Sequence, residues 1–130
     1  MLTLEFEDTY RVLLVRFSGI HVPEEIDELD RVALEFVAWR GPVRGLLLDY
    51  SSVEAVAVPQ SLIARRARLP LISLEYERVM VVPTPELYEL ARAYADQQRG
   101  FGIKEPHVVG SMLDAYKLLQ IEQPNFRPIS

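Results

Sequence analysis

The hydrophobic pattern at the start of the chain predicts a pair of strands. Leu4 and Phe6 alternate with polar residues, and residues 12–17 form a mostly apolar run. The polar residues 7–9 lie between these two segments. Two short hydrophobic segments separated by a polar turn are typical of an antiparallel hairpin. We therefore expect the chain to begin with two antiparallel strands.

Three later hydrophobic segments predict further strands. Residues 43–48 carry one charge and end at Asp49, and the segment 76–82 finishes in an apolar run. Strands without a polar face are typical of a parallel sheet that is covered on both sides. The strand that ends at Asp49 is predicted to be the central one. The segment 107–109 is expected to add a brief strand.

Four segments have apolar residues at every third or fourth position, which predicts four helices. Pro23 and Pro85 suit the first position of a helix, where a backbone N–H is not needed. Thr84 and Ser111 suit the N-cap, because their hydroxyls accept from the free N–H groups of the first turn. The predicted helical segments are residues 23–40, 59–69, 85–99 and 111–119.

The predicted elements follow the order β-β-α-β-α-β-α-β-α, which is typical of an α/β layer sandwich. We expect one domain over residues 1–119, with a mixed sheet of four to five strands, an N-terminal antiparallel hairpin and about four helices. Residues 120–130 contain Pro124 and Pro128 and are predicted to form an extended C-terminal tail.

Composition and charge exclude several classes of function. Of the 130 residues, 49% are hydrophobic and 25% are charged, which is enough apolar material for one core. The absence of cysteine excludes disulfides, thiol nucleophiles and cysteine-bound metals. The net charge of −5 argues against a nucleic-acid partner, because such binding depends on clustered lysine and arginine.

Neither a membrane span nor an export signal is predicted. The longest apolar runs, such as 79–82, are far shorter than the roughly 20 residues that cross a bilayer. The N-terminal residues 1–5 lack the basic and apolar regions of a signal peptide. We therefore expect a cytoplasmic protein with no transmembrane segment.

The segment 46–56 resembles part of the anti-sigma-factor-antagonist (STAS) domain, a family of bacterial regulators. In that family an aspartate ends the central strand, a serine follows two residues later, and aliphatic residues come next. Asp49, Ser51, Val53 and Val56 match this pattern. The order of elements is also similar, so the resemblance covers nearly the whole chain. It implies a STAS-like fold and a regulatory role through a protein partner.

The sequence departs from this family at the site of phosphorylation. STAS domains carry an Asp-Ser-Ser-Gly-like stretch whose serine or threonine is phosphorylated by a partner kinase, whereas residues 57–60 read Ala-Val-Pro-Gln. Val58 stands where the hydroxyl is expected, and valine cannot be phosphorylated. Ser51, Ser52 and Ser61 remain as alternative acceptors. The resemblance therefore implies a regulator that has lost the usual switch.

The strongest candidate binding surface combines the end of the central strand with the start of the second helix. Ligands of open α/β sheets bind at the carboxyl ends of strands, and the basic second helix offers a site for an acidic partner or an anionic headgroup. Ordinary turn chemistry and a solvated charged face explain the same residues, so both interpretations stay open. The candidate residues are Tyr50, Ser51, Ser52, Pro59, Gln60, Ser61, Arg65 and Arg66.

No catalytic or metal-binding constellation is predicted. His21 and His107 are the only histidines, and a zinc site needs three or four converging ligands. We expect each histidine to be a loop or strand-edge residue. The chain has no Gly-x-Ser-x-Gly motif, and Gly100 and Gly102 follow a helix instead of opening one as a dinucleotide-binding loop does. We expect no enzyme activity, no metal and no cofactor.

Three hypotheses for function remain open, and a non-enzymatic protein-binding module is the leading one. The alternative is a binder or carrier of a small apolar or lipid-like ligand, because the C-terminal helix resembles divergent STAS-like proteins grouped with lipid-transfer (CRAL-TRIO type) domains. It requires a pocket lined by residues such as Phe36, Leu62, Tyr94 and Tyr116. An enzyme is the third hypothesis. Oppositely charged helices and Trp39 also indicate a homodimer as one form of self-association.

Overall fold

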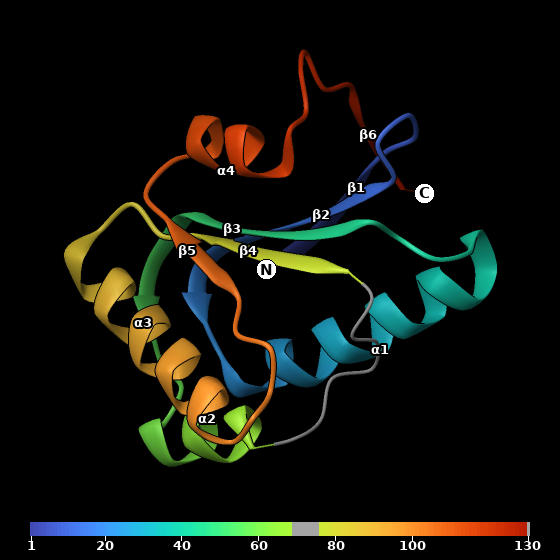
Figure 1. Cartoon of the computed structure of the whole chain (residues 1–130). Coiled ribbons are helices and arrows are strands. Elements are labelled where there is room, and N and C mark those ends of the chain that lie inside the picture. The colour runs from blue at the N-terminus through green and yellow to red at the C-terminus, as the bar shows by residue number, and fades with distance from the viewer. Residues whose placement is uncertain (69–75, 130) are drawn as a thin grey trace.

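A six-stranded mixed sheet forms the centre of the molecule, with helices on both of its faces (Figure 1). The computed structural model describes residues 1–68 and 76–129. The strands are β1 (Leu2–Glu7), β2 (Val12–His21), β3 (Gly45–Val56), β4 (Glu77–Val81), β5 (His107–Val109) and β6 (Phe126–Pro128). The helices are α1 (Pro23–Arg40), α2 (Gln60–Ala67), α3 (Pro85–Gly100) and α4 (Met112–Leu119).

The strand order β5-β4-β3-β2-β1-β6 confirms the predicted hairpin and parallel core. β1 pairs antiparallel with β2, while β2, β3, β4 and β5 are parallel to one another. β3 extends beyond the predicted 43–48 and stays paired with β2 as far as Val56 opposite His21. The register shifts twice along this pair, between Arg16 and Ser18 and between Gly19 and Ile20. The last residues of β3 are therefore still paired with β2, although they lie beyond the buried part of the strand.

The sheet has six strands, so the predicted number of four to five is wrong. The additional strand comes from the C-terminal tail, where β6 pairs antiparallel with β1. The N–H of Ile129 also donates to the carbonyl of Leu4 at 3.1 Å. A three-residue edge strand that contains Pro128 has no hydrophobic alternation of its own, so the sequence does not reveal it.

The sheet divides the hydrophobic core into two clusters, one on each of its faces. Figure 1 shows α1, α2 and α3 on one face and α4 on the other. Gly45 allows the close approach of α4, because a Cβ there would lie 3.3 Å from Leu119 Cδ2. The buried residues of the first face are Phe6, Leu13, Val15, Phe17, Phe36, Val43, Leu46, Leu48, Tyr50, Tyr76, Val82 and Ala91. Those of the second face are Val12, Leu14, Leu47, Val79, Val81, Ala115, Leu119 and Ile121.

The predicted starts of α1, α3 and α4 are confirmed, whereas α2 runs from Gln60 to Ala67 and its predicted end at Leu69 lies outside the described residues. Pro23 and Pro85 occupy the first turns of α1 and α3. The Thr84 hydroxyl accepts from the N–H of Leu87 at 3.3 Å, and the Ser111 hydroxyl accepts from the N–H of Asp114 at 3.1 Å. These bonds satisfy N–H groups that have no partner within the helix.

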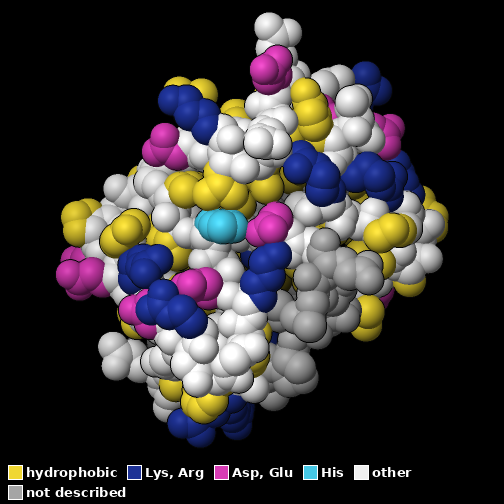
Figure 2. Space-filling view, in the orientation of Figure 1, with side chains coloured by type: hydrophobic (Ala, Val, Ile, Leu, Met, Phe, Trp, Pro, Cys, Tyr) yellow, Lys and Arg dark blue, Asp and Glu magenta, His cyan; other side chains and the backbone are white. Residues whose placement is uncertain are grey.

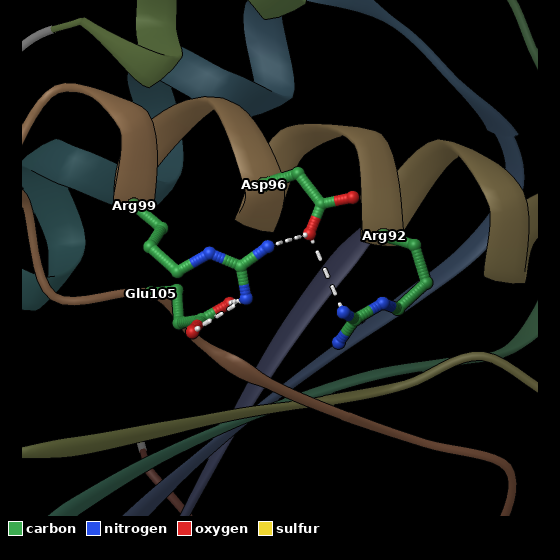
Figure 3. A network of polar contacts seen from close by, with 4 residues as sticks. All are labelled: Arg92, Asp96, Arg99 and Glu105. Carbon is green, nitrogen blue, oxygen red and sulfur yellow. Dashed lines mark hydrogen bonds and ion pairs between the residues drawn. The ribbon is translucent and has the colours of Figure 1, made fainter.

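Ion pairs cover the outer side of α3 and the neighbouring sheet edge. Asp96 accepts from Arg92 at 3.3 Å and from Arg99 at 2.9 Å, and Arg99 also donates to Glu105 in the segment before β5 (Figure 3). Figure 2 shows acidic and basic side chains interspersed on this face. Exposed pairs of this kind contribute about 0–1 kcal/mol each. Within residues 1–68 and 76–129, no helix has the length and apolar character needed to cross a membrane.

Candidate functional site

A cavity of about 140 Å³ lies between the sheet and the helices α1, α2 and α3. The small side chains of Ala33 on α1 and Ala91 on α3 face it, so these helices leave space above the sheet. Apart from His21, Asp30, Arg66 and Arg78, every described lining residue is apolar or a tyrosine. The other lining residues are Ile26, Leu29, Ala33, Leu46, Leu48, Tyr50, Val56, Val58, Ile63, Tyr76, Met80, Val82, Leu87, Leu90, Ala91 and Tyr94.

Arg66 and Asp30 form a two-pronged ion pair in the wall of this cavity. Nε of Arg66 donates to Oδ2 of Asp30 at 3.0 Å, and Nη2 donates to Oδ1 at 2.7 Å. The pair joins α2 to α1, and only 17% of the Arg66 side chain is exposed. The third nitrogen, Nη1, is buried and has no hydrogen-bond partner among the described residues. The guanidinium therefore keeps donors that no described residue uses.

A second arginine and two tyrosines line the cavity near this pair. Arg78 is buried on β4 and donates to Oε1 of Gln98 at 2.7 Å and to the carbonyl of Lys104. Burial raises the pKa of Tyr76, against the opposing charge effect of Arg78. Tyr94, on α3, also lines the cavity. Several hydrogen-bonding groups thus share one largely apolar space.

The other end of the cavity is formed by aromatic residues. Tyr50 stacks on Phe17 with ring centroids 4.8 Å apart, and His21 meets both rings edge-on. Burial raises the pKa of the Tyr50 hydroxyl well above its ordinary value. Nδ1 of His21 lies 2.9 Å from Oε1 of Glu25, which also accepts the N–H of Val22 at 3.0 Å. This end is held rigidly by packing and hydrogen bonds.

Glu25 is a buried carboxylate at the start of α1. Burial alone would raise its pKa, but hydrogen bonds from the N-terminal ammonium, the N–H of Val22 and His21 lower the pKa below its ordinary value. The ammonium of Met1 lies 2.7 Å from Oε2. The negative charge of Glu25, at the start of α1, therefore holds together the residue before β1 and the end of β2.

The structure separates the predicted site residues into two sets. Tyr50 and Arg66 turn toward the cavity, where both line its wall. The others lie at the surface along the end of β3 and the start of α2. These exposed residues are Ser51, Ser52, Pro59, Gln60, Ser61 and Arg65.

Val58, at the position that matches the STAS phosphoacceptor, is buried and lines the cavity. Pro59 follows it as the N-cap residue of α2 and makes no side-chain cap. The nearest described hydroxyl in sequence is that of Ser61, inside the first turn of α2 and exposed. The strand-to-helix connection thus presents an apolar side chain inward at this point.

Asp49, which matches the aspartate of the STAS pattern, faces away from the cavity. Its Oδ2 accepts from Arg16 at 2.8 Å, and Arg16 also donates to Glu5 at 2.6 Å. Its Oδ1 accepts the N–H of Ser51 at 2.9 Å. Asp49 therefore fixes the backbone where β3 leaves the core and bridges to β2.

Sequence reasoning missed several of the residues that the cavity brings together. Neither Asp30 nor Arg78 is among the site residues that the sequence predicts, although both line the cavity. The prediction for His107 is confirmed, since it lies on the edge strand β5, but His21 is instead buried at the end of the internal strand β2. The spacing of four residues between His21 and Glu25 was the available signal. Within the described residues, no group of three or more His, Asp or Glu side chains could hold a metal ion.

Of the four residues predicted to line a pocket, only Tyr94 lines this cavity. Phe36 packs on Phe6 with ring centroids 4.8 Å apart. Tyr116 lies on α4, on the opposite face of the sheet, and packs near Phe126. Leu62 is half-buried on α2 and is not part of the lining.

Comparison with known proteins identifies the fold. No family model matches the chain, and no curated protein matches it by sequence. The arrangement of strands and helices is that of an anti-sigma factor antagonist, the STAS fold. One similar solved structure is the anti-sigma factor antagonist SpoIIAA in its unphosphorylated form, with a TM-score of 0.59 and 14% identity over 92% of this chain and 98% of that chain. At this identity the likeness establishes the fold.

Proposed function

We propose that this chain is a cytoplasmic, non-enzymatic regulatory module that binds a protein partner. The observation that carries the proposal is the likeness to an anti-sigma factor antagonist over 92% of the chain. Proteins that share a fold can differ in function, so the proposal also needs a surface on this chain.

The proposed partner surface is formed by the end of β3 and the start of α2. Ser51 and Ser52 are exposed beyond the buried part of β3, and Gln60 and Ser61 are exposed in the first turn of α2. Arg65 lies exposed on the same helix, whereas Arg66 is engaged by Asp30. A partner that carries an acidic side chain opposite Arg65 fits this surface.

The usual phosphorylation switch is proposed to be absent from this module. The hydroxyl that would carry phosphate is replaced by Val58, whose side chain packs inward. Phosphate acts by adding close to two negative charges, which a valine cannot accept. Protein purified from its own host should therefore carry no phosphate on Ser51, Ser52 or Ser61, and intact mass spectrometry checks this.

Reversing one charge on the proposed surface tests partner binding. Tagged wild-type protein and the variants Arg65→Glu and Lys117→Glu are incubated with extract of the host, and bound proteins are quantified by mass spectrometry. Lys117 is exposed on α4, on the other face of the sheet, and is the matched control. We expect one protein to be retained by wild type and Lys117→Glu but reduced at least tenfold by Arg65→Glu. Equal retention by all three would contradict the proposed surface.

A second candidate function is the binding of a small apolar ligand, which the 140 Å³ cavity favours. Engineered cavities of about 150 Å³ with apolar walls bind molecules the size of benzene. Native mass spectrometry of protein from its own host would detect a retained ligand and would also show whether the chain is a homodimer. Loss of any added mass on unfolding supports this function, and a ligand-free chain contradicts it.

A further inference from the structure

The charged groups of the cavity wall favour a negatively charged ligand. Among the described residues, and leaving His21 aside, the charged side chains of the lining are two arginines and one aspartate. Asp30 is neutralised by Arg66, while the two described hydrogen-bond partners of Arg78 are uncharged. In a space of low dielectric constant, an excess of positive charge attracts an anion more strongly than it does in water.

Nη1 of Arg66 is available to such an anion, because no described residue accepts from it. A guanidinium carries five N–H groups in a planar fork, and Asp30 uses one from Nε and one from Nη2. One N–H of Nη1 and the second one of Nη2 lie side by side at the end of the guanidinium and match the spacing of two carboxylate oxygens. Nη1 exposes less than 1 Å² and has no hydrogen-bond partner among the described residues. A buried donor without an acceptor is energetically unfavourable, and an incoming acceptor would remove that cost.

The rest of the cavity selects for an apolar body. Leu46 and Leu48 on β3, Met80 on β4 and Val82 directly after β4 form its floor, and the remaining lining is mostly aliphatic or aromatic. Ligand sites commonly combine such walls with a few polar groups that fix the orientation. The volume of 140 Å³ suits a single ring or a short aliphatic chain.

We infer that the cavity binds a small monocarboxylate with an apolar body. The carboxylate pairs with Nη1 and Nη2 of Arg66 after a small rotation of the guanidinium against Asp30, and the body lies on the floor of the cavity. This inference rests on the second candidate function, ligand binding in the cavity, and is independent of partner binding.

Three probes of similar shape and different charge test the inference. Benzoate, benzamide and benzylamine are titrated into the full chain at pH 7, and binding is followed by methyl chemical shifts of Leu48 and Val82 in NMR spectra. We expect benzoate to bind at least tenfold more tightly than benzamide, and benzylamine to bind more weakly than either. Equal affinities for benzoate and benzamide would overturn the anionic specificity but leave ligand binding intact. No binding of any probe would overturn both.

Two pairs of variants assign the effect to the cavity and to Arg66. Ala91→Leu fills the cavity and should abolish benzoate binding, while Ala93→Leu, exposed on the same helix, should leave it unchanged. The double variant Asp30→Asn/Arg66→Gln replaces the ion pair by two neutral amides, so no buried charge is left alone. It should lose the tenfold preference for benzoate and keep the affinity for benzamide. A preference that survives in this double variant would show that Arg66 does not hold the carboxylate.

Discussion

At the scale of single residues, Glu7 links the start of the chain to its end. Its Oε1 accepts the N–H groups of Thr9 at 2.7 Å and Tyr10 at 3.3 Å, in the turn between β1 and β2. Its Oε2 accepts the N–H of Asn125, just before β6. The bond from Asn125 contributes most to lowering the pKa of Glu7, against the opposing effect of burial. One carboxylate thus closes the hairpin turn and anchors the tail.

Replacement of Glu7 by glutamine should destabilise the protein and reduce its sensitivity to acid. We expect Glu7→Gln to lower the free energy of unfolding by about 1 kcal/mol at pH 7, as the charge-assisted bonds to three N–H groups weaken. Because the pKa of Glu7 is lower in the folded chain than its ordinary value of 4.5, its stabilising effect is complete above that value. The effect is lost as the pH falls through the folded pKa.

Urea denaturation at pH 7 and at pH 3 measures both effects. The difference between wild type and Glu7→Gln should shrink at the lower pH. Asp8→Asn is the control, because Asp8 is its exposed neighbour in the same turn. A difference that is the same at both pH values would show that the charge of Glu7 does not stabilise the fold.

At the scale of elements, side-chain caps determine where the two later helices begin. Ser111 precedes α4 and accepts the N–H of Asp114. Loss of such a cap costs about 1 kcal/mol. We expect Ser111→Ala to lower the free energy of unfolding by about that amount, measured by urea denaturation. Ser52→Ala, at an exposed position in β3, should change it little; equal effects of the two substitutions would rule out the cap as the cause.

Local signals in the sequence predicted most helices and strands, but not how far each strand extends or every pairing between strands. Prolines, glycines and cap residues act within a few positions, so the four helices and the opening hairpin were recognisable. β6 was not recognisable, because its stability comes from pairing with β1 and from the contact of Glu7 with Asn125, more than a hundred residues apart. The extension of β3 to Val56 likewise depends on pairing with β2 and leaves exposed residues that have no strand pattern.

At the scale of the whole molecule, the sheet separates two environments. The face covered by α1, α2 and α3 encloses the cavity, and the face covered by α4 has its own smaller core (Figure 1). Helical periodicity shows which residues of a helix turn inward but not which face of the sheet the helix covers. Tyr94 and Tyr116 each lie on the apolar face of a predicted helix. Tyr94 lines the cavity, as predicted, whereas Tyr116 packs on the opposite face of the sheet.

The cavity and the proposed partner surface meet at the connection from β3 to α2. Val56 and Val58 line the cavity, while Pro59 and Gln60 next to them are exposed. Trp39 is 66% exposed at the distant end of α1, outside this region. A partner that binds at the start of α2 therefore contacts the segment that closes one side of the cavity.

The most direct test of the proposed regulatory function is hydrogen exchange of the chain alone and in complex with the partner recovered by the charge-reversal experiment. We predict slower exchange in the complex over residues 51–67, which include the end of β3 and α2, and unchanged exchange over α4. Protection confined to α4, or to the end of α1 around Trp39, would contradict the proposed surface and the regulatory function built on it.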